Sequence, residues 1–289
     1  MSRNNKDRLG VSTPDVQTAN PPITPTDQNQ AVFNFTTPTE FVELPSGGRF
    51  YDEEHPLHNE ETVEIKFMTA KEEDILTSPS LLKKGLAIDR LLQSVVINKE
   101  IDLDSLLVGD KNALLVATRV TGYGPDYSTN VTCPACTTSS KYQFDLSDIP
   151  GQPGGVSTIN SEHVTESDRG TFFITGLERT KAKVEVRLLR GHDEKMRNSR
   201  MKKKKKHSIT TSVFLEMLSS FIVSVNDSTD PNYIASFLEN MPAMDSRHLR
   251  ATYSTLIPNV DLNQEFECEA CGTTTDMEVP LNAEFFWPR

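Results

Sequence analysis

Two Cys-x-x-Cys pairs constrain what this chain can fold into more than any other feature. The chain has four cysteines, Cys133, Cys136, Cys268 and Cys271, so none is left outside a pair. Four cysteines in 289 residues are too few for a disulfide scaffold. Four thiolates from two tight turns make a closed tetrahedral site of the kind that holds structural zinc. The sequence therefore predicts one structural zinc per chain, bound by these four residues.

The distance between the pairs leaves other arrangements open. Cys136 and Cys268 are separated by 131 residues, far more than in a compact zinc ribbon. Each pair could meet a pair of another chain, or form a local disulfide, which a reducing cytosol disfavours. A redox Cys-x-x-Cys would open a helix after a strand, but Thr137–Ser140 is not a helix start.

Matching spacings indicate an internal duplication. Asp110 precedes Cys133 by 23 residues, and Asp245 precedes Cys268 by 23 residues. Two segments, Val63–Met68 and Val184–Leu189, share one strand pattern followed by a charged helix start. Two copies related by a pseudo-twofold axis would bring equivalent loops together. The predicted fold is α+β, with two pseudo-repeated halves (strand pair, helices, zinc knuckle, strand) joined by a shared four-cysteine zinc site.

Composition sets the expected boundaries. Residues 1–32 are polar and rich in Pro, Thr, Asn and Gln, which predicts a disordered N-terminal arm. The first repeat covers 33–149 with the Cys133/Cys136 knuckle. Residues 150–170 are rich in Gly, Pro and Ser and are predicted to be a linker. The second repeat covers 171–289 with a basic loop and the Cys268/Cys271 knuckle.

Capping residues and apolar periodicity predict where the helices lie. The apolar stripes predict helices over 81–98 and 214–225. The expected helix N-caps are Thr69 (in a T-x-x-E capping box), Asp110, Asp230 (followed by Pro231) and Asp245.

A run of five lysines stands out in a chain whose formal net charge is −11. Because like charges repel, we expect the run to be a solvated loop or to contact an acidic protein partner. Its members are Lys202, Lys203, Lys204, Lys205 and Lys206. No aromatic residue is interleaved with them, so base stacking is not indicated and nucleic acid is not an expected partner.

The sequence lacks the motifs of the common enzyme classes. It has no phosphate-binding loop, dinucleotide fingerprint, nucleophile elbow or H-E-x-x-H pair, so we expect neither catalysis nor a small-molecule substrate. No apolar run approaches the roughly 18 residues of a membrane span, and residues 1–10 lack the apolar core of a secretory signal. We therefore expect a soluble, cytosolically made protein without a membrane partner. The aromatic C-terminus, Phe285-Phe286-Trp287, is expected to pack on the core.

Several motifs along residues 41–288 resemble the T4-type bacteriophage baseplate protein family, the hub and hub-assembly proteins of contractile-tailed phages. The segments that carry the resemblance are Phe41–Gly48, Met68–Leu76, Val108–Lys111, Tyr123–Tyr127 before Cys133–Cys136, Pro242–Arg247 and Phe285–Pro288.

The resemblance implies a non-enzymatic tail component that acts through protein–protein contacts with other baseplate and tail proteins. It would reside in the virion tail baseplate and in the host cytoplasm during assembly. Three alternatives remain: an assembly chaperone absent from the mature particle, a zinc-ribbon nucleic-acid-binding protein that uses the lysine run, and a redox protein that uses Cys133 and Cys136.

Overall fold

The computed structural model describes residues 36–286 except 160–161, 168, 207–212 and 282. The arm predicted for residues 1–32 lies outside the described residues. None of the described helices is both long and apolar enough to cross a membrane.

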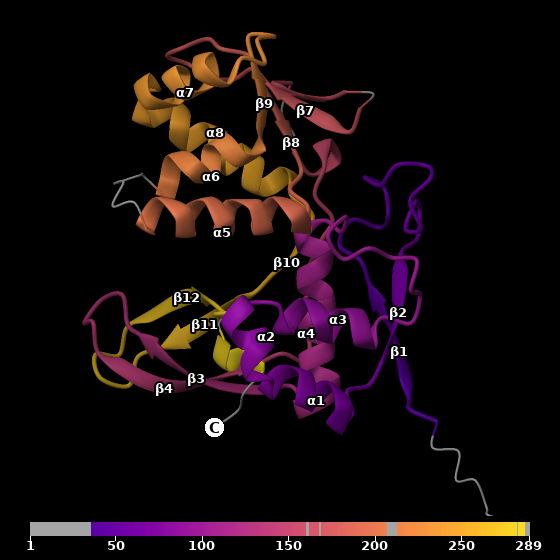
Figure 1. The fold of residues 1–289 in the computed structure, drawn as a ribbon. Helices are drawn as coiled ribbons and strands as arrows, with labels where there is room; N and C mark the ends of the chain where they lie inside the picture. The colour runs from indigo at the N-terminus through magenta and orange to yellow at the C-terminus, as the bar shows by residue number, and fades with distance from the viewer. Residues whose placement is uncertain (1–35, 160–161, 168, 207–212, 282, 287–289) are drawn as a thin grey trace, which may run out of the picture. The chain divides into compact units, whose positions relative to one another are not determined.

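Helices and small antiparallel sheets alternate along the described chain (Figure 1), which confirms the predicted α+β class. The helices are α1 (Ala70–Thr77), α2 (Pro79–Lys84), α3 (Ala87–Val95), α4 (Val108–Tyr123), α5 (Gly191–Lys206), α6 (Val213–Phe221), α7 (Pro231–Asn240) and α8 (Ala243–Leu256), with 3-10 turns η1 (Val156–Thr158) and η2 (Ala283–Phe286). The two-stranded sheets pair β1 (Thr39–Glu43) with β2 (Thr62–Lys66), β3 (Asp126–Thr132) with β4 (Ser139–Asp145), β5 (Gly151–Gln152) with β10 (Asn259–Val260), and β11 (Asn263–Glu267) with β12 (Thr274–Glu278). The four-stranded sheet has the order β6 (Val164–Glu166), β7 (Thr171–Ile174), β8 (Val184–Arg187), β9 (Ile222–Val225).

Two of the four predicted helix N-caps are confirmed. Thr69 and Glu72 form the reciprocal capping box at the start of α1, and the Asp230 side chain accepts a hydrogen bond from the Asn232 N–H at the start of α7. The predictions for Asp110 and Asp245 are wrong, since each lies inside the first helical turn. Both carboxylates are buried and accept hydrogen bonds from a distant loop instead.

Three other local predictions, two helix bounds and the lysine loop, are corrected. The helix expected over 81–98 is divided into α2 and α3 at Gly85, whose left-handed φ of 71° ends α2. The helix expected over 214–225 ends at Phe221, because the β-branched residues that follow pair with β8 as β9. Residues 150–170, predicted to be a linker, contain the short strands β5 and β6, and their role as a boundary between repeats stays a prediction. The lysine run, predicted as a loop, forms the end of helix α5.

The motif around Asp110 is explained by two close contacts of α4. The Asp110 carboxylate accepts hydrogen bonds from the Ser46 N–H (3.0 Å), the Ser46 hydroxyl (2.6 Å) and the Tyr51 hydroxyl (2.7 Å). Burial raises the pKa of Asp110, and these three donors oppose the rise. Gly109 is required because a Cβ there would lie 1.8 Å from the Pro258 carbonyl oxygen.

Asp245 occupies the corresponding place in α8. It accepts hydrogen bonds from the Arg179 N–H (3.0 Å), the Thr180 N–H (2.7 Å) and the Thr180 hydroxyl (2.8 Å). Asp110 and Asp245 are each the third residue of a helix. Each carboxylate accepts hydrogen bonds from both the backbone N–H and the side-chain hydroxyl of one distant residue, Ser46 or Thr180. Each contact fixes a helix start against the turn that follows an earlier strand.

A partly buried ion pair joins β2 to α1. The Lys66 ammonium lies 2.7 Å from the Glu72 carboxylate, which is fully buried. The Ser94 hydroxyl of α3 donates to the same carboxylate at 2.6 Å. Burial raises the pKa of Glu72, but hydrogen bonds from Lys66, Ser94 and Thr69 outweigh burial and lower it to about 2.

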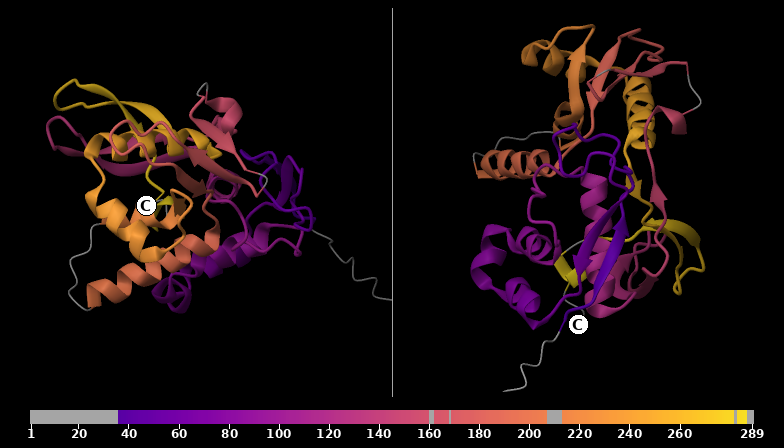
Figure 2. Two further views of the ribbon diagram at one scale, coloured as in Figure 1. Left: turned by 90° about the horizontal axis from the view of Figure 1, so that it is seen from above. Right: turned by 90° about the vertical axis from the view of Figure 1, so that its right-hand side faces the viewer.

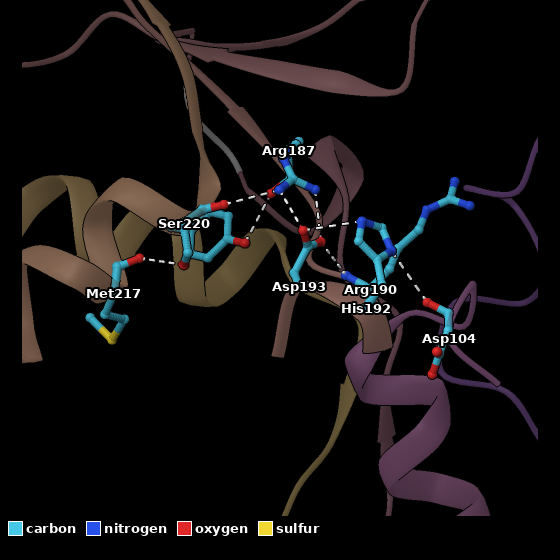
Figure 3. Close-up of polar contacts among 8 residues, drawn as sticks. Asp104, Arg187, Arg190, His192, Asp193, Met217 and Ser220 are labelled. Carbon is cyan, nitrogen blue, oxygen red and sulfur yellow. Dashed lines mark hydrogen bonds and ion pairs between the residues drawn. The ribbon is translucent and has the colours of Figure 1, made fainter. Parts of the chain in front are cut away.

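A similar pair joins β8 to α5 (Figure 3). The Arg187 guanidinium binds the Asp193 carboxylate through two hydrogen bonds of 2.7 Å and also donates to the Ser220 carbonyl oxygen at 3.2 Å. The Arg190 N–H donates to Asp193 at 3.0 Å. Bidentate arginine–carboxylate pairs are among the stronger and more directional polar contacts. This one fixes the start of α5 against the four-stranded sheet.

The low pKa of Glu72 predicts a loss of stability in acid. Because its pKa is lower in the folded state than the ordinary 4.5, its contribution to the free energy of unfolding is complete above that pH and is lost between about pH 4.5 and about pH 2. We expect Glu72→Gln to reduce this loss by about 2 kcal/mol, measured as the difference in urea unfolding between pH 6 and pH 3. Asp74→Asn, at an exposed position of the same helix, should leave the acid loss unchanged. Equal pH profiles for the wild type and Glu72→Gln would contradict this role.

The predicted halves also meet away from the cysteines. The Val108 N–H donates to the Leu189 carbonyl at 3.0 Å, and the Gly191 N–H donates to the Leu106 carbonyl at 2.9 Å. The buried apolar side chains of both halves belong to one hydrophobic cluster. Of the aromatic C-terminus that the sequence predicted to pack on the core, two residues lie in this cluster, Phe285 and Phe286, each 2 % exposed. Trp287 lies outside the described residues.

Candidate metal centre

Two β-hairpins carry the four cysteines. The turn between β3 and β4 holds Cys133 and Cys136, and the turn between β11 and β12 holds Cys268 and Cys271. Figure 1 shows these hairpins adjacent to each other, although they come from distant parts of the sequence. Both knuckles lead into strands, whereas a redox Cys-x-x-Cys leads into a helix.

Contacts between the hairpins set their relative register. The Tyr142 hydroxyl of β4 donates to the Glu265 carbonyl of β11 at 2.9 Å, and its ring packs edge-on against Phe266 at 4.9 Å between centroids. The Asp145 N–H donates to the Gln264 side-chain oxygen at 3.1 Å, and the Gln264 side-chain amide donates to the Asp145 carbonyl oxygen. These contacts bring the two turns to the same end of the paired hairpins.

The four sulfur atoms converge. All four Sγ atoms lie within 4.8 Å of one another, and the four cysteines are free. The Cys133–Cys271 and Cys136–Cys268 Sγ distances are 3.8 Å and 3.7 Å. A tetrahedral zinc with Zn–S bonds of about 2.3 Å would hold its sulfur ligands about 3.8 Å apart. The cluster therefore fits one tetrahedral ion of that size.

The two knuckles have the same backbone hydrogen bonds. The Cys133 N–H donates to the Thr138 carbonyl at 2.9 Å, and the Cys268 N–H donates to the Thr273 carbonyl at 3.0 Å. The residue after the second cysteine has a left-handed backbone in each turn, with φ of 59° at Thr137 and 67° at Gly272. This conformation turns the chain tightly enough for both thiols of a pair to face one point.

Two threonines in these turns, Thr138 and Thr273, contact the cysteines and were not predicted as site residues. Hydrogen bonds from Thr138 lower the pKa of Cys136 to about 6. Hydrogen bonds from Thr273 likewise lower the pKa of Cys271. The signal was present in the sequence, because a threonine follows the first cysteine of each pair by five residues.

The buried cysteines are in a different environment from the outer ones. Cys133 and Cys268 are 1 % and 2 % exposed, whereas Cys136 is partly exposed and Cys271 is exposed. Backbone N–H groups of the same turn lower the pKa of Cys268, but burial and the neighbouring thiols outweigh them and raise it to about 11. A bound metal would supply the positive charge that stabilises the thiolate form of Cys268.

The structure separates the two sets of candidate residues that the sequence analysis named. It brings together Cys133, Cys136, Cys268 and Cys271, whereas Lys202–Lys206 lie at the end of α5, on a different element.

Comparison with known proteins gives one result. The sequence profile of the family described as "T4 bacteriophage base plate protein" matches residues 37–287. No curated protein and no solved structure matches the chain.

Proposed function

Because the chain belongs to the T4 bacteriophage base plate protein family, we propose that it is a non-enzymatic structural component of the hub region of a contractile phage tail. Family membership assigns the protein to the virion tail baseplate, among other tail proteins. The match over residues 37–287 is the observation that carries this assignment, since it spans both hairpins and all four cysteines. The hub position and the absence of catalysis are the proposed parts.

We propose that the metal is zinc and that its role is structural. Four thiolates form a complete tetrahedral set, so no coordination position is left for substrate or water. The Sγ distances and the two matching turns support one ion within one chain. Such an ion would join residues 133–136 to residues 268–271 and fix the two hairpins to each other.

We also propose that the chain arose by duplication of one unit. Adding 121 to the numbers of Lys66 and Glu72 gives Arg187 and Asp193, which form the corresponding ion pair. Adding 135 to the numbers of Cys133 and Thr138 gives Cys268 and Thr273, which form the corresponding turn. The proposed boundaries remain 33–149 and 171–289, with 150–170 between them.

An assembly chaperone that leaves before maturation is the second candidate, since contacts with tail proteins during assembly in the host cytoplasm suit both roles. Nothing in the described part of the fold favours the nucleic-acid-binding alternative, because the cysteine hairpins and the lysine run lie on different elements.

Composition of the virion tests the proposal. We expect quantitative mass spectrometry of purified particles to find the chain at a fixed copy number, together with the baseplate proteins. Particles assembled with a Cys268→Ser chain should lack the protein or lack complete baseplates, because the unfixed hairpins would not present a defined surface. Particles that are complete and infectious without the chain would contradict the structural role and favour the chaperone.

A further inference from the structure

A groove of about 640 Å³ runs along the outer edge of β1. It is lined by β1 and the turn after it, by one face of α4, by residues of the segment 146–153, and by Val260 of β10. Figures 1 and 2 show the β1–β2 pair lying beside α4. Its volume is within the range of about 300–1,000 Å³ typical of ligand sites in proteins.

The edge of β1 that faces this groove has unpaired backbone groups. The Leu44 N–H donates to the Glu61 carbonyl, and the Phe67 N–H donates to the Pro38 carbonyl, so the even-numbered residues of β1 bond to β2. In an antiparallel pair, the alternate residues direct their N–H and C=O groups to the other side. These are Thr39, Phe41 and Glu43, and within the described residues their backbone groups have no hydrogen-bond partner.

The opposite edge of the sheet is covered in part, at the centre of β2. The Ile97 N–H donates to the Glu64 carbonyl, and Ile65 forms a β-bridge with Val96. The β2 edge therefore has a partner at its centre, whereas among the described residues the β1 edge has none. Unpaired strand edges are templates for the addition of another strand.

The lining of the groove indicates what kind of strand would fit. Small apolar residues of α4 line it at helical spacing, Ala113, Val116, Ala117 and Val120. Three carboxylates line it as well, those of Glu40, Glu43 and Asp148, and among the described residues no Lys, Arg or His does. Small apolar side chains suit the α4 face, and basic side chains complement the carboxylates.

We propose that this groove binds an extended segment of a neighbouring protein, which adds to the free edge of β1 as an antiparallel or parallel strand. The segment alternates small apolar residues, which face α4 on the Val42 side of β1, with Lys or Arg residues, which lie on the Glu43 side of the strand. The proposal rests on the proposed baseplate role only for the source of the segment. The groove itself can be tested with the purified chain.

The test uses the full chain and a fluorescent heptapeptide of alternating lysine and valine, with an alternating glutamate and valine peptide as its control. We expect the lysine peptide to slow hydrogen exchange at the N–H groups of Phe41 and Glu43, measured by NMR, and to bind with a measurable anisotropy change. The glutamate peptide should do neither. Absence of protection at these amides at millimolar lysine peptide would overturn the proposal.

Matched variants separate strand addition from general attraction to an acidic protein. Glu40→Lys with Glu43→Lys should weaken binding at least tenfold, whereas Glu53→Lys with Glu54→Lys, at exposed positions outside the groove, should change it less than threefold. Phe41→Pro removes a groove-facing N–H and should weaken binding at least tenfold, whereas Phe41→Val keeps that N–H and should not. The proposal would be overturned if the two double charge-reversal variants weakened binding equally, or if Phe41→Pro and Phe41→Val did.

Two further outcomes would assign the groove to other occupants and also overturn it. Binding that appears only after deletion of residues 1–35 would assign the groove to the chain's own N-terminal segment. Protection of the same amides by increasing protein concentration alone, with dimer formation, would assign it to a second copy. Failure of the peptide test leaves the virion measurement unaffected, so the two proposals can fail separately.

Discussion

Removal of the metal is expected to unfold the chain and not merely to loosen it. Binding of a structural zinc contributes about 10–16 kcal/mol in small zinc domains, whereas a whole domain is stable by only about 5–15 kcal/mol. Native mass spectrometry should find one zinc per monomer, and a strong chelator should remove the zinc together with the compact charge states. Circular dichroism should show the accompanying loss of tertiary structure.

Substitution of a cysteine tests whether the loss of structure depends on the four-cysteine site. Cys268→Ser removes a buried ligand and should abolish stoichiometric zinc binding, whereas Ser139→Ala, at an exposed position just after the first knuckle, should keep one zinc and an unchanged melting temperature. A chelated chain that stays a compact monomer would contradict the structural role of the metal. A zinc-bridged oligomer would move the site to an interface between chains.

Replacement of Arg119 is expected to have the second largest effect. This side chain is 1 % exposed, and its guanidinium donates to the carbonyl oxygens of Phe285 (2.8 Å), Gly124 (2.8 Å) and Asp126 (3.0 Å). It thereby joins the end of α4, the start of β3 and the C-terminal 3-10 turn. Within the described residues no carboxylate accompanies these three bonds, so backbone carbonyls satisfy the buried donors.

We expect Arg119→Met to lower the free energy of unfolding by about 3–5 kcal/mol, because it leaves the buried Phe285 carbonyl and two partly buried carbonyls without this donor and removes the packing of a buried side chain. Arg119→Lys should recover only part of that loss, since one ammonium cannot reproduce the planar fork. Arg90→Met, at an exposed position of α3, is the matched control and should cost less than about 1 kcal/mol. Urea unfolding at neutral pH measures all three, and an Arg119→Met chain as stable as the control would contradict the proposed role.

The partial success of the helix predictions has a physical cause. Thr69 and Asp230 act on N–H groups two or three residues away, so the capping pattern alone locates α1 and α7. Asp110 resembles a cap in sequence, but its acceptor oxygens bind Ser46, which is 64 residues earlier. Local pattern cannot distinguish a carboxylate that caps its own helix from one that binds a distant loop.

The sequence by itself determined the four candidate ligands and the class of fold. Two Cys-x-x-Cys turns supply the four thiolates that a closed tetrahedral metal site needs, and periodic apolar patterns indicate strands and helices. It also carried the family motifs, of which Gly109 and Asp110 are explained by their contacts.

Tertiary structure alone decided which distant segments meet. It pairs Ile222–Val225 with β8 as a strand, buries Arg119 against the C-terminal turn, and leaves one edge of β1 without a partner among the described residues. Each of these depends on contacts between residues far apart in the chain, whose energies no short window of sequence contains. The local sequence thus limited the structures that each segment could adopt, and long-range packing determined which structure and which partner it has.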